Sequence, residues 1–341
     1  MSKNTFFSNE EIRCQPLWQD LQGRHLFVAG GTGFFGRWIL TFLSEGLRRG
    51  FQFNVSVLSR DPQSFLAGAF DDQWRGFNWV KGQLADFDLN GTKIDYMLHG
   101  AESADRQDHH SVSILEQSLR GTQNFLMQAE KSGCSSIHYL SSGAVYGAQR
   151  DVLQKEDGPF SEVADFYAQG KKLSEEAFLN WGARRNARVS ISRSFAFVGP
   201  YLPLDRQYAA GNFVGACLRG CEIHIKGDGT ALRSYMYPTE LVIWLLTILF
   251  RAKSGSIFNV GSDQAVSILE LAQRCREVSQ ERGKTPREII VQQKPVAGVE
   301  PSRYVPSIEK ARGELGLQVE IDLTQALRRT FDFYAHAEGT I

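Results

Sequence analysis

The sequence predicts an α/β fold built on a doubly wound parallel sheet. Two observations support this fold class. Short apolar segments typical of buried strands alternate with helical patterns along most of the chain, and a glycine-rich turn joins the first such strand to the helix that follows it. After about residue 200 the chain is richer in glycine, proline and short elements, which indicates a smaller C-terminal α/β lobe beside the sheet.

The first strand is expected at residues 25–29, which form a compact apolar segment. Apolar side chains then recur at helical spacing from Trp38 to Leu47, which predicts a helix. A second strand follows at residues 51–59, where apolar and polar side chains alternate until Asp61-Pro62 breaks the pattern. Further strands are expected at residues 78–81, 96–99, 136–140, 189–192 and 257–260.

The length of 341 residues suits one large domain or two fused ones. We expect residues 1–23 to form an N-terminal extension that packs on the body of the protein. Residues 24–200 should form the sheet domain, and residues 201–341 the smaller lobe, with some of its strands and helices returning to the first domain. Open α/β sheets bind their ligands at the carboxyl ends of the strands, where this lobe would lie.

Composition argues against several classes of partner. The 38 basic and 38 acidic side chains balance and no long basic run is present, so a nucleic-acid partner is not expected. The longest apolar block, residues 241–250, is about half as long as a membrane span. Five cysteines without a C-x-x-C pair favour a reduced, cytoplasmic protein, and no metal is expected, because His109-His110 is interpreted as part of a polar loop.

Residues 30–36 contain both G-x-G-x-x-G and G-x-x-G-x-x-G. Glycines at this spacing allow a tight turn, a close approach of backbone N–H groups to a pyrophosphate, and close packing of the next helix. Between a strand and a helix, they predict a Rossmann-type domain that binds a dinucleotide. The expected contacts in this turn are Gly30, Thr32, Gly33, Phe34, Phe35 and Gly36.

The choice between NAD and NADP depends on the end of the second strand. NAD sites usually carry an acidic residue there, whereas this chain has Ser59 and Arg60. Arg60 suits the 2′-phosphate of NADP or could stack on adenine. Asp61 is close enough to be a displaced partner of the NAD ribose, so both cofactors stay open.

A catalytic pair is predicted at Tyr167 and Lys171, which lie four residues apart and therefore on one face of a helix. A nearby ammonium lowers the pKa of a tyrosine, so that the phenol can take a hydroxyl proton while hydride leaves the same carbon. The pair follows the segment from Leu140 to Gly147, where an apolar strand ends in the hydroxyl groups of Ser141 and Ser142.

Five motifs occur in one order: the glycine turn, S-S-x-x-V-Y-G at residues 141–147, Y-x-x-x-K at residues 167–171, the segment 193–200, and the segment 227–235. In this order the chain resembles an extended short-chain dehydrogenase/reductase of the NAD-dependent epimerase/dehydratase type that acts on nucleotide sugars. The resemblance covers roughly residues 25–330.

This resemblance implies roles for individual residues. Ser142 would hydrogen-bond the reacting oxygen, Tyr167 would be the acid/base, and Lys171 would bind the nicotinamide ribose and tune Tyr167. Further cofactor contacts are implied at Ser59, Arg60, Gln83, Leu84, His99, Ala101 and Phe195. Contacts with the substrate, above all its diphosphate, are implied at Asn212, Phe213, Arg233 and Arg303.

The implied reaction is oxidation of a sugar hydroxyl, at C4, by hydride transfer to bound NAD(P), with an epimerase and a tightly held cofactor as the first expectation. Dehydratases of this family carry Asp-Glu directly after the catalytic Ser or Thr, whereas Gly143 and Ala144 stand here, so a 4,6-dehydratase is disfavoured. The alternatives are an NADPH-dependent 4-ketosugar reductase or dehydrogenase and a dinucleotide-binding regulatory protein.

The resemblance also implies a homodimer that packs two helices of each subunit as a four-helix bundle. One of these helices carries the Y-x-x-x-K pair, and its apolar residues Phe166, Leu173, Ala177 and Phe178 fit such an interface and fit a helix buried within its own chain equally well. Glu175-Glu176 on the same helix is interpreted as a solvated face.

Overall fold

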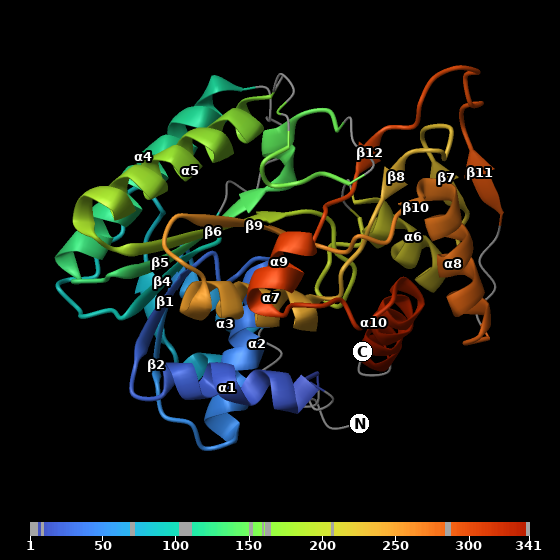
Figure 1. The fold of residues 1–341 in the computed structure, drawn as a ribbon. Helices are drawn as coiled ribbons and strands as arrows, with labels where there is room; N and C mark the ends of the chain where they lie inside the picture. Colours follow the sequence, from blue (N-terminus) through green and yellow to red (C-terminus); the bar gives the residue numbers. More distant parts are fainter. Residues whose placement is uncertain are drawn as a thin grey trace.

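Seven parallel strands form the central sheet of the computed structural model, which describes residues 6–7, 10–68, 72–101, 111–149, 153–158, 160, 165–205, 208–283 and 288–338 (Figure 1). The strand order is β3-β2-β1-β4-β5-β6-β9, so it reverses direction between β1 and β4. This topology confirms the predicted doubly wound sheet. The strands are β1 (His25–Ala29), β2 (Asn54–Ser59), β3 (Asn78–Lys81), β4 (Tyr96–His99), β5 (Ser136–Ser142), β6 (Arg188–Ser194) and β9 (Ser256–Val260).

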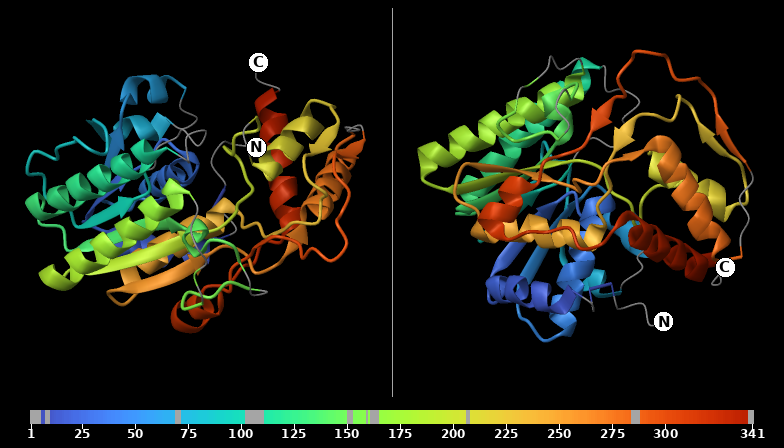
Figure 2. Two further views of the ribbon diagram at one scale, coloured as in Figure 1. Left: turned by 90° about the horizontal axis from the view of Figure 1, so that it is seen from above. Right: turned by 45° about the vertical axis from the view of Figure 1, so that its right-hand side comes forward.

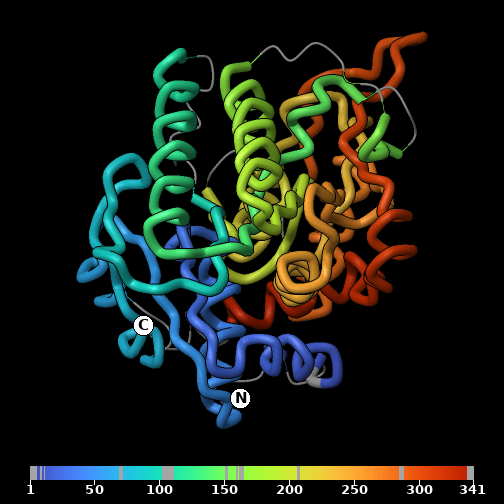
Figure 3. Tube along the Cα trace, turned by 60° about the vertical axis from the view of Figure 1, so that its left-hand side comes forward, coloured from blue at the N-terminus to red at the C-terminus, as the bar shows by residue number. Residues whose placement is uncertain are grey.

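Helices cover both faces of this sheet. On one face α4 (Val112–Lys131) and α5 (Phe166–Arg185) run side by side, and on the other α2 (Phe34–Arg48) packs against α7 (Pro238–Arg251) (Figures 1 and 3). The connection from β2 to β3 contains α3 (Pro62–Ala67) and the 3₁₀ helix η2 (Asp72–Gly76). A separate apolar core fills each face, and these two cores fix the sheet that carries the site.

The N-terminal segment forms a helix, α1 (Glu11–Leu21), that packs on α2 and α7. Trp18 is fully buried, stacks on Phe42 at 5.0 Å between ring centroids, and donates its indole N–H to the Phe42 carbonyl oxygen at 3.0 Å. A side chain on Gly46 would meet the Trp18 ring, so α2 keeps a glycine where α1 docks. The sequence predicts a packed segment here, and the structure adds that this segment is helical.

Short strands and further helices build the smaller lobe beside the carboxyl ends of the strands (Figure 2). Its strands are β7 (Ile223–Ile225), β8 (Leu232–Arg233), β10 (Val266–Ser267), β11 (Ile289–Val291) and β12 (Arg303–Tyr304), and its helices are α6 (Ala209–Leu218), α8 (Ile268–Gln280) and α10 (Leu323–Glu338). The strands pair as two small sheets, β10-β8-β12 and β11-β7.

The chain returns from this lobe to the central sheet. β9 pairs in parallel with β6, and α9 (Glu309–Leu315) packs on β9 and α7. We propose that the boundary between the sheet domain and the smaller lobe lies at residue 200. The segments around α7, β9 and α9 then return to the sheet domain.

Candidate active site

The glycine turn lies at the carboxyl end of β1, at the point where the strand order reverses. The helix α2 begins directly after it, and its N-cap residue is Gly33, so no side chain caps the first amide groups and no acidic residue stands in the first turn. Uncapped N–H groups and the helix dipole favour an anion at this position. The turn therefore fits the pyrophosphate of a dinucleotide, with half-buried Thr32, Phe34 and Phe35 around it.

Three glycines of the turn leave no room for a side chain. A Cβ on Gly36 would overlap the carbonyl oxygen of Gly30, and one on Gly31 would overlap the Val57 side chain. Gly30 has a φ of +91°, and a Cβ there would lie 2.5 Å from the backbone of Gly100. Gly33 differs, because it is exposed and the nearest atom to its Cβ would be at 3.6 Å. The fold itself leaves space beside Gly33, where the predicted pyrophosphate would lie.

Exposed side chains follow the ends of β2 and β3. Arg60 is exposed directly after the buried Ser59, and the Asp61 carboxylate caps α3 by accepting the Ser64 N–H at 3.0 Å. Gln83 is exposed after β3, while Leu84 packs against Gly121 of α4. Arg60 is thus presented at the edge where an adenosine ribose would lie, and Asp61 already serves the helix cap.

His99 at the end of β4 turns its ring into the core. The ring lies 4.8 Å from that of Phe125, 5.1 Å from that of Tyr139 and 5.6 Å from that of Phe178, measured between centroids. Burial lowers the pKa of His99 to about 3, so the ring is neutral at pH 7. The predicted cofactor contact at this position therefore falls to the backbone, because it is the backbone around Ala101 that lies against Gly30.

The three predicted catalytic side chains come from β5 and α5. Ser142 ends β5, and its Oγ accepts the Ala144 N–H at 3.2 Å at the start of the 3₁₀ helix η4 (Gly143–Tyr146). Lys171 is buried and donates from Nζ to the Leu140 carbonyl oxygen at 2.8 Å. Its Nζ lies 6.0 Å from the centroid of the Tyr167 ring. The structure thus holds the ammonium between the tyrosine and the end of the strand that carries Ser142.

A buried ion pair lies one turn beyond Lys171. The interpretation of Glu175 as part of a solvated face is wrong, because the side chains of Glu175 and Arg193 are only 4% and 5% exposed and pair at 2.7 Å. Arg193 also donates to the Tyr146 hydroxyl at 2.9 Å, which in turn donates to Asn259 Oδ1 at 2.7 Å. A buried arginine requires a buried anion as its partner. Arg193, next to the predicted strand at residues 189–192, was therefore the signal in the sequence that could have indicated this ion pair.

Tyr304 is a neighbour of the site that no sequence motif indicated. Its hydroxyl lies 3.3 Å from Ser142 Oγ, and its ring lies 4.6 Å from that of Phe195, the predicted nicotinamide neighbour. Gly143 lies beneath both: a Cβ there would be 2.8 Å from the Phe195 ring and 2.9 Å from the Tyr304 hydroxyl. A strand of two residues has no periodic pattern, so only its position next to Arg303 could have pointed to Tyr304.

The two predicted diphosphate-binding arginines lie on paired strands of the small lobe. Arg303 stands opposite Leu232, and Tyr304 opposite Arg233, where β12 pairs with β8. Both guanidinium groups belong to half-buried residues, and that of Arg233 donates to the Leu232 carbonyl oxygen at 2.7 Å. On α6, Asn212 is half-buried, but Phe213 is buried in the apolar core, so any substrate contact there falls to Asn212 or the backbone.

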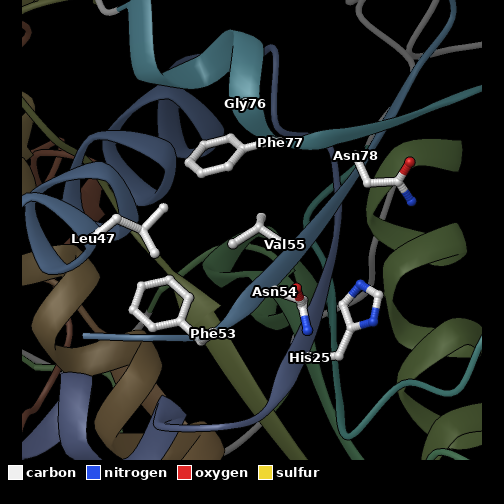
Figure 4. A pocket seen from close by; sticks show the side chains of 8 residues that line it. All are labelled: His25, Leu47, Phe53, Asn54, Val55, Gly76, Phe77 and Asn78. Carbon is white, nitrogen blue, oxygen red and sulfur yellow. The ribbon is translucent and has the colours of Figure 1, made fainter. Parts of the chain in front are cut away.

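A surface pocket of about 260 Å³ lies at the amino ends of the strands β1, β2 and β3, opposite the carboxyl ends that carry the candidate site (Figure 4). It is therefore separate from the candidate active site. Its lining consists of His25, Leu47, Phe53, Asn54, Val55, Gly76, Phe77 and Asn78.

Two classes of feature are missing from the part of the chain that the structure describes. No three His, Cys, Asp or Glu side chains there form a group that could hold a metal ion, and Asp105, Asp108, His109 and His110 lie outside the described residues. None of the described helices is long and apolar enough to cross a membrane. The five cysteines are free.

Comparison with known proteins identifies related enzymes. UDP-glucuronic acid decarboxylase 1 from Arabidopsis thaliana is 26% identical over 314 residues, which cover 89% of this chain and 68% of that protein. The dTDP-D-glucose 4,6-dehydratase from Homo sapiens is 23% identical over 330 residues, covering 91% of this chain and 90% of that protein.

Solved structures show the same fold. UDP-N-acetylglucosamine 4-epimerase from Methanobrevibacter ruminantium M1, in complex with UDP-N-acetylmuramic acid, superposes with a TM-score of 0.80 at 18% identity over 93% of this chain and 99% of that chain. UDP-glucose 4-epimerase from Thermotoga maritima, with UDP-glucose, gives a TM-score of 0.78 at 19% identity over 92% and 99%.

A family model assigns the chain. The model described as the NAD dependent epimerase/dehydratase family matches residues 26–261, from the first strand through the last strand of the central sheet. The match confirms the resemblance inferred from the five motifs and the prediction of a dinucleotide cofactor. The chain therefore belongs to the NAD-dependent epimerase/dehydratase family, whose enzymes modify nucleotide sugars.

Proposed function

We propose that this chain oxidises the C4 hydroxyl of a nucleotide-diphosphate sugar with bound NAD(P) and acts as an epimerase. The observation that carries the proposal is the placement of Lys171. Its buried ammonium is held by the Leu140 carbonyl oxygen beside the Tyr167 ring, at the end of the strand that carries Ser142. This is the arrangement that an alcohol oxidation by hydride transfer requires from the protein.

The protein's part in the reaction is proton transfer and orientation. A bound nicotinamide would supply the acceptor for the hydride that leaves the sugar carbon. Tyr167 takes the proton of the hydroxyl on that carbon, and Lys171 favours the phenolate form because the ammonium is a nearby positive charge. Ser142 donates a hydrogen bond to the same oxygen and keeps it at the phenol. Gly30, Gly33 and Gly36 would hold the pyrophosphate at the start of α2.

The residues after Ser142 favour epimerisation over elimination of water. Gly143 and Ala144 cannot transfer a proton, and the space beside Gly143 is filled by Phe195 and Tyr304. Turned over in the site, the 4-keto sugar would take back the same hydride at C4 on its other face, and its oxygen would take a proton from Tyr167. Epimerisation therefore requires no acid or base other than those already present in the site.

The small lobe supplies the side chains that would bind the diphosphate of the substrate. Arg233 and Arg303 lie on adjacent strands and present planar, charged forks that suit a diphosphate. Asn212 lies on helix α6 of the same lobe and would contribute a polar contact to the same group. Because the lobe stands beside the carboxyl ends of the main strands, the diphosphate held there would direct the sugar to Ser142 and Tyr167.

Turnover assays test the proposal. The purified protein is incubated with UDP-, dTDP-, CDP- and GDP-hexoses, and products are separated by chromatography and identified by NMR. We expect the 4-epimer of at least one sugar, and Tyr167→Phe should lower kcat about 100-fold or more. Tyr96→Phe is the control, since Tyr96 packs on Phe250 at the far end of β4. Bound dinucleotide without any product would instead favour a regulatory, dinucleotide-binding protein.

Arg60 supports one alternative, an NADPH-dependent 4-ketosugar reductase. Its exposed guanidinium lies at the end of β2, and the neighbouring Asp61 is engaged by the cap of α3. Under this alternative the protein binds NADPH at least about tenfold more tightly than NADH, and Arg60→Ala removes most of that preference. Equal affinity for the two cofactors in the wild-type protein would contradict it.

We also propose that α4 and α5 form the homodimer interface. Exposed apolar side chains lie on these two adjacent helices, at Val112, Leu119 and Met127 of α4 and Leu173 of α5. Phe178, for which both an interface and burial within its own chain were open, is buried in the core of its own subunit. Light scattering should give the mass of a dimer for the wild type and that of a monomer for Leu119→Arg combined with Leu173→Glu. A monomeric wild-type protein would contradict the proposal.

A further inference from the structure

We propose that Tyr304 is a positioning residue for the active site: its hydroxyl aims the proton of Ser142 at the reacting sugar oxygen. The inference rests on the proposed function, in which Ser142 donates to that oxygen. Tyr304 reaches the site from the small lobe, 162 positions away in the sequence from Ser142, and its hydroxyl lies 3.3 Å from Ser142 Oγ.

The hydrogen-bonding capacity of Ser142 carries the argument. A serine hydroxyl has one proton to donate and two lone pairs that accept. The Ala144 N–H donates to one lone pair at 3.2 Å. When Tyr304 donates to the other, both accepting positions are filled and the serine proton has one direction left, toward the bound sugar. A donor at Tyr304 also polarises the serine hydroxyl, which strengthens the bond that Ser142 gives.

The surroundings of Tyr304 fix its hydroxyl at this place. Its ring packs on that of Phe195, with centroids 4.6 Å apart. Its hydroxyl also donates a hydrogen bond to the Ser194 carbonyl oxygen at 3.3 Å, a second acceptor that it can use while no sugar is present. Rotation of the hydroxyl about the phenol C–O bond can then redirect its hydrogen bond from the Ser194 carbonyl oxygen to Ser142 Oγ, without movement of the ring.

Gly143 belongs to the same arrangement. A Cβ on this residue would lie 2.9 Å from the Tyr304 hydroxyl and 2.8 Å from the Phe195 ring, closer than a carbon atom can pack without displacement. The position after Ser142 must therefore be a glycine as long as Tyr304 stays on the serine. An acidic residue directly after Ser142 and the contact between Tyr304 and Ser142 therefore exclude each other, because Tyr304 occupies the space that the acidic side chain would need.

A double-mutant cycle tests the inference on whichever hexose the wild-type enzyme converts. Tyr304→Phe keeps the ring on Phe195 and removes only the hydroxyl. We expect kcat to fall about 3- to 10-fold, with KM for the nucleotide sugar within about twofold of the wild-type value. In a Ser142→Ala background the same change should cost nothing further, because Tyr304 acts through the serine. Tyr96→Phe serves as the matched control and should leave kcat unchanged.

Two sets of results would overturn the proposal. An unchanged kcat in Tyr304→Phe, a rise in KM alone, or an equal loss in the presence and absence of the Ser142 hydroxyl would each show that Tyr304 does not act through Ser142. A crystal structure of the protein without substrate gives a test that needs no turnover. It should show the two hydroxyl groups in contact in the wild type and apart in Gly143→Ala, and separated hydroxyl groups in the wild type would refute the inference. Failure of the proposed function is a separate result, namely no conversion of any sugar by the wild-type enzyme.

Discussion

The two halves of the proposed active site are built in different ways. The half on the central sheet rests on a buried ion pair between Glu175 and Arg193, one helical turn from Lys171. The half on the small lobe presents Arg233 and Arg303 as half-exposed side chains on strands of two residues. Proton transfer requires donor and acceptor groups that are held in fixed positions. Binding of a diphosphate requires positively charged side chains that are accessible to it. Removal of a charge should therefore lower the stability of the fold in the first half and only weaken binding in the second.

The largest expected effect is in the buried pair. Glu175→Ala leaves the Arg193 guanidinium buried without its carboxylate, and we expect the free energy of unfolding to fall by about 3–5 kcal/mol. Urea denaturation measures this loss. Glu281→Ala is the control, because Glu281 pairs with Arg328 at 2.7 Å on the exposed surface and should leave stability unchanged. Equal losses in the two variants would remove the contrast between the halves.

The glycine turn allows a second test within the central half. Gly36→Ala places a methyl group on the Gly30 carbonyl oxygen and should destabilise the fold by about 1–3 kcal/mol or more. Gly33→Ala meets no atom closer than 3.6 Å, so the melting temperature should stay close to that of the wild type. Its NAD affinity, measured by calorimetry, should nevertheless fall about tenfold, because the methyl group occupies the space of the pyrophosphate. Unchanged affinity in Gly33→Ala would place the dinucleotide elsewhere.

In the small lobe, charge removal should affect binding alone. Arg303→Ala should weaken the binding of UDP, used as a diphosphate probe, about tenfold, because a charge-assisted hydrogen bond is lost. The melting temperature should not change. Arg251→Ala is the control: this arginine pairs with Asp20 at 3.1 Å, at the end of α7. A lower melting temperature of Arg303→Ala together with wild-type affinity for UDP would show that Arg303 is structural.

Local patterns predicted the strands well where the apolar segment and the hydrogen-bonded strand coincide. The strands at residues 25–29, 78–81 and 96–99 have the predicted bounds. β5 was predicted to end at Leu140, but it continues to Ser142, because Ser141 and Ser142 still pair with Arg193 and Ser194 of β6. The end of a strand depends on how far the neighbouring strand continues to pair with it. A local sequence pattern carries no information about that neighbour.

The same limit applies to the site. Tyr167 and Lys171 share one helix, so their spacing was enough to predict the pair. Glu175 needed a partner on β6, and Tyr304 needed one on β5, so only the folded chain reveals what they contact. In this molecule Glu175 and Tyr304 contact partners on elements distant in the sequence, Arg193 and Ser142, whereas the predicted pair Tyr167 and Lys171 forms a local motif.

The smallest expected effect compares Glu175 with a second buried carboxylate, Glu240 of α7. Glu240 accepts the backbone N–H groups of Glu320 at 2.6 Å and Ile321 at 3.3 Å, while Arg13 is 3.8 Å away. Burial raises the pKa of Glu240 from 4.5 to about 7. The folded state therefore binds the proton more tightly than the unfolded state, so this contribution is fully present below about pH 4.5 and is lost as the pH rises through about 7.

Glu240→Gln removes this titration, because the amide oxygen can still accept the two N–H groups but carries no charge. The stability of the wild type relative to Glu240→Gln should therefore be higher at about pH 5 than at about pH 8, by about 1 kcal/mol or more. Denaturant unfolding at both pH values measures the difference. Glu176→Gln, on the exposed face of α5, should give the same difference at both. If the wild type and Glu240→Gln keep a constant difference, burial has not shifted the pKa of Glu240, and an incompletely paired carboxylate is then tolerated in the core as readily as the paired Glu175.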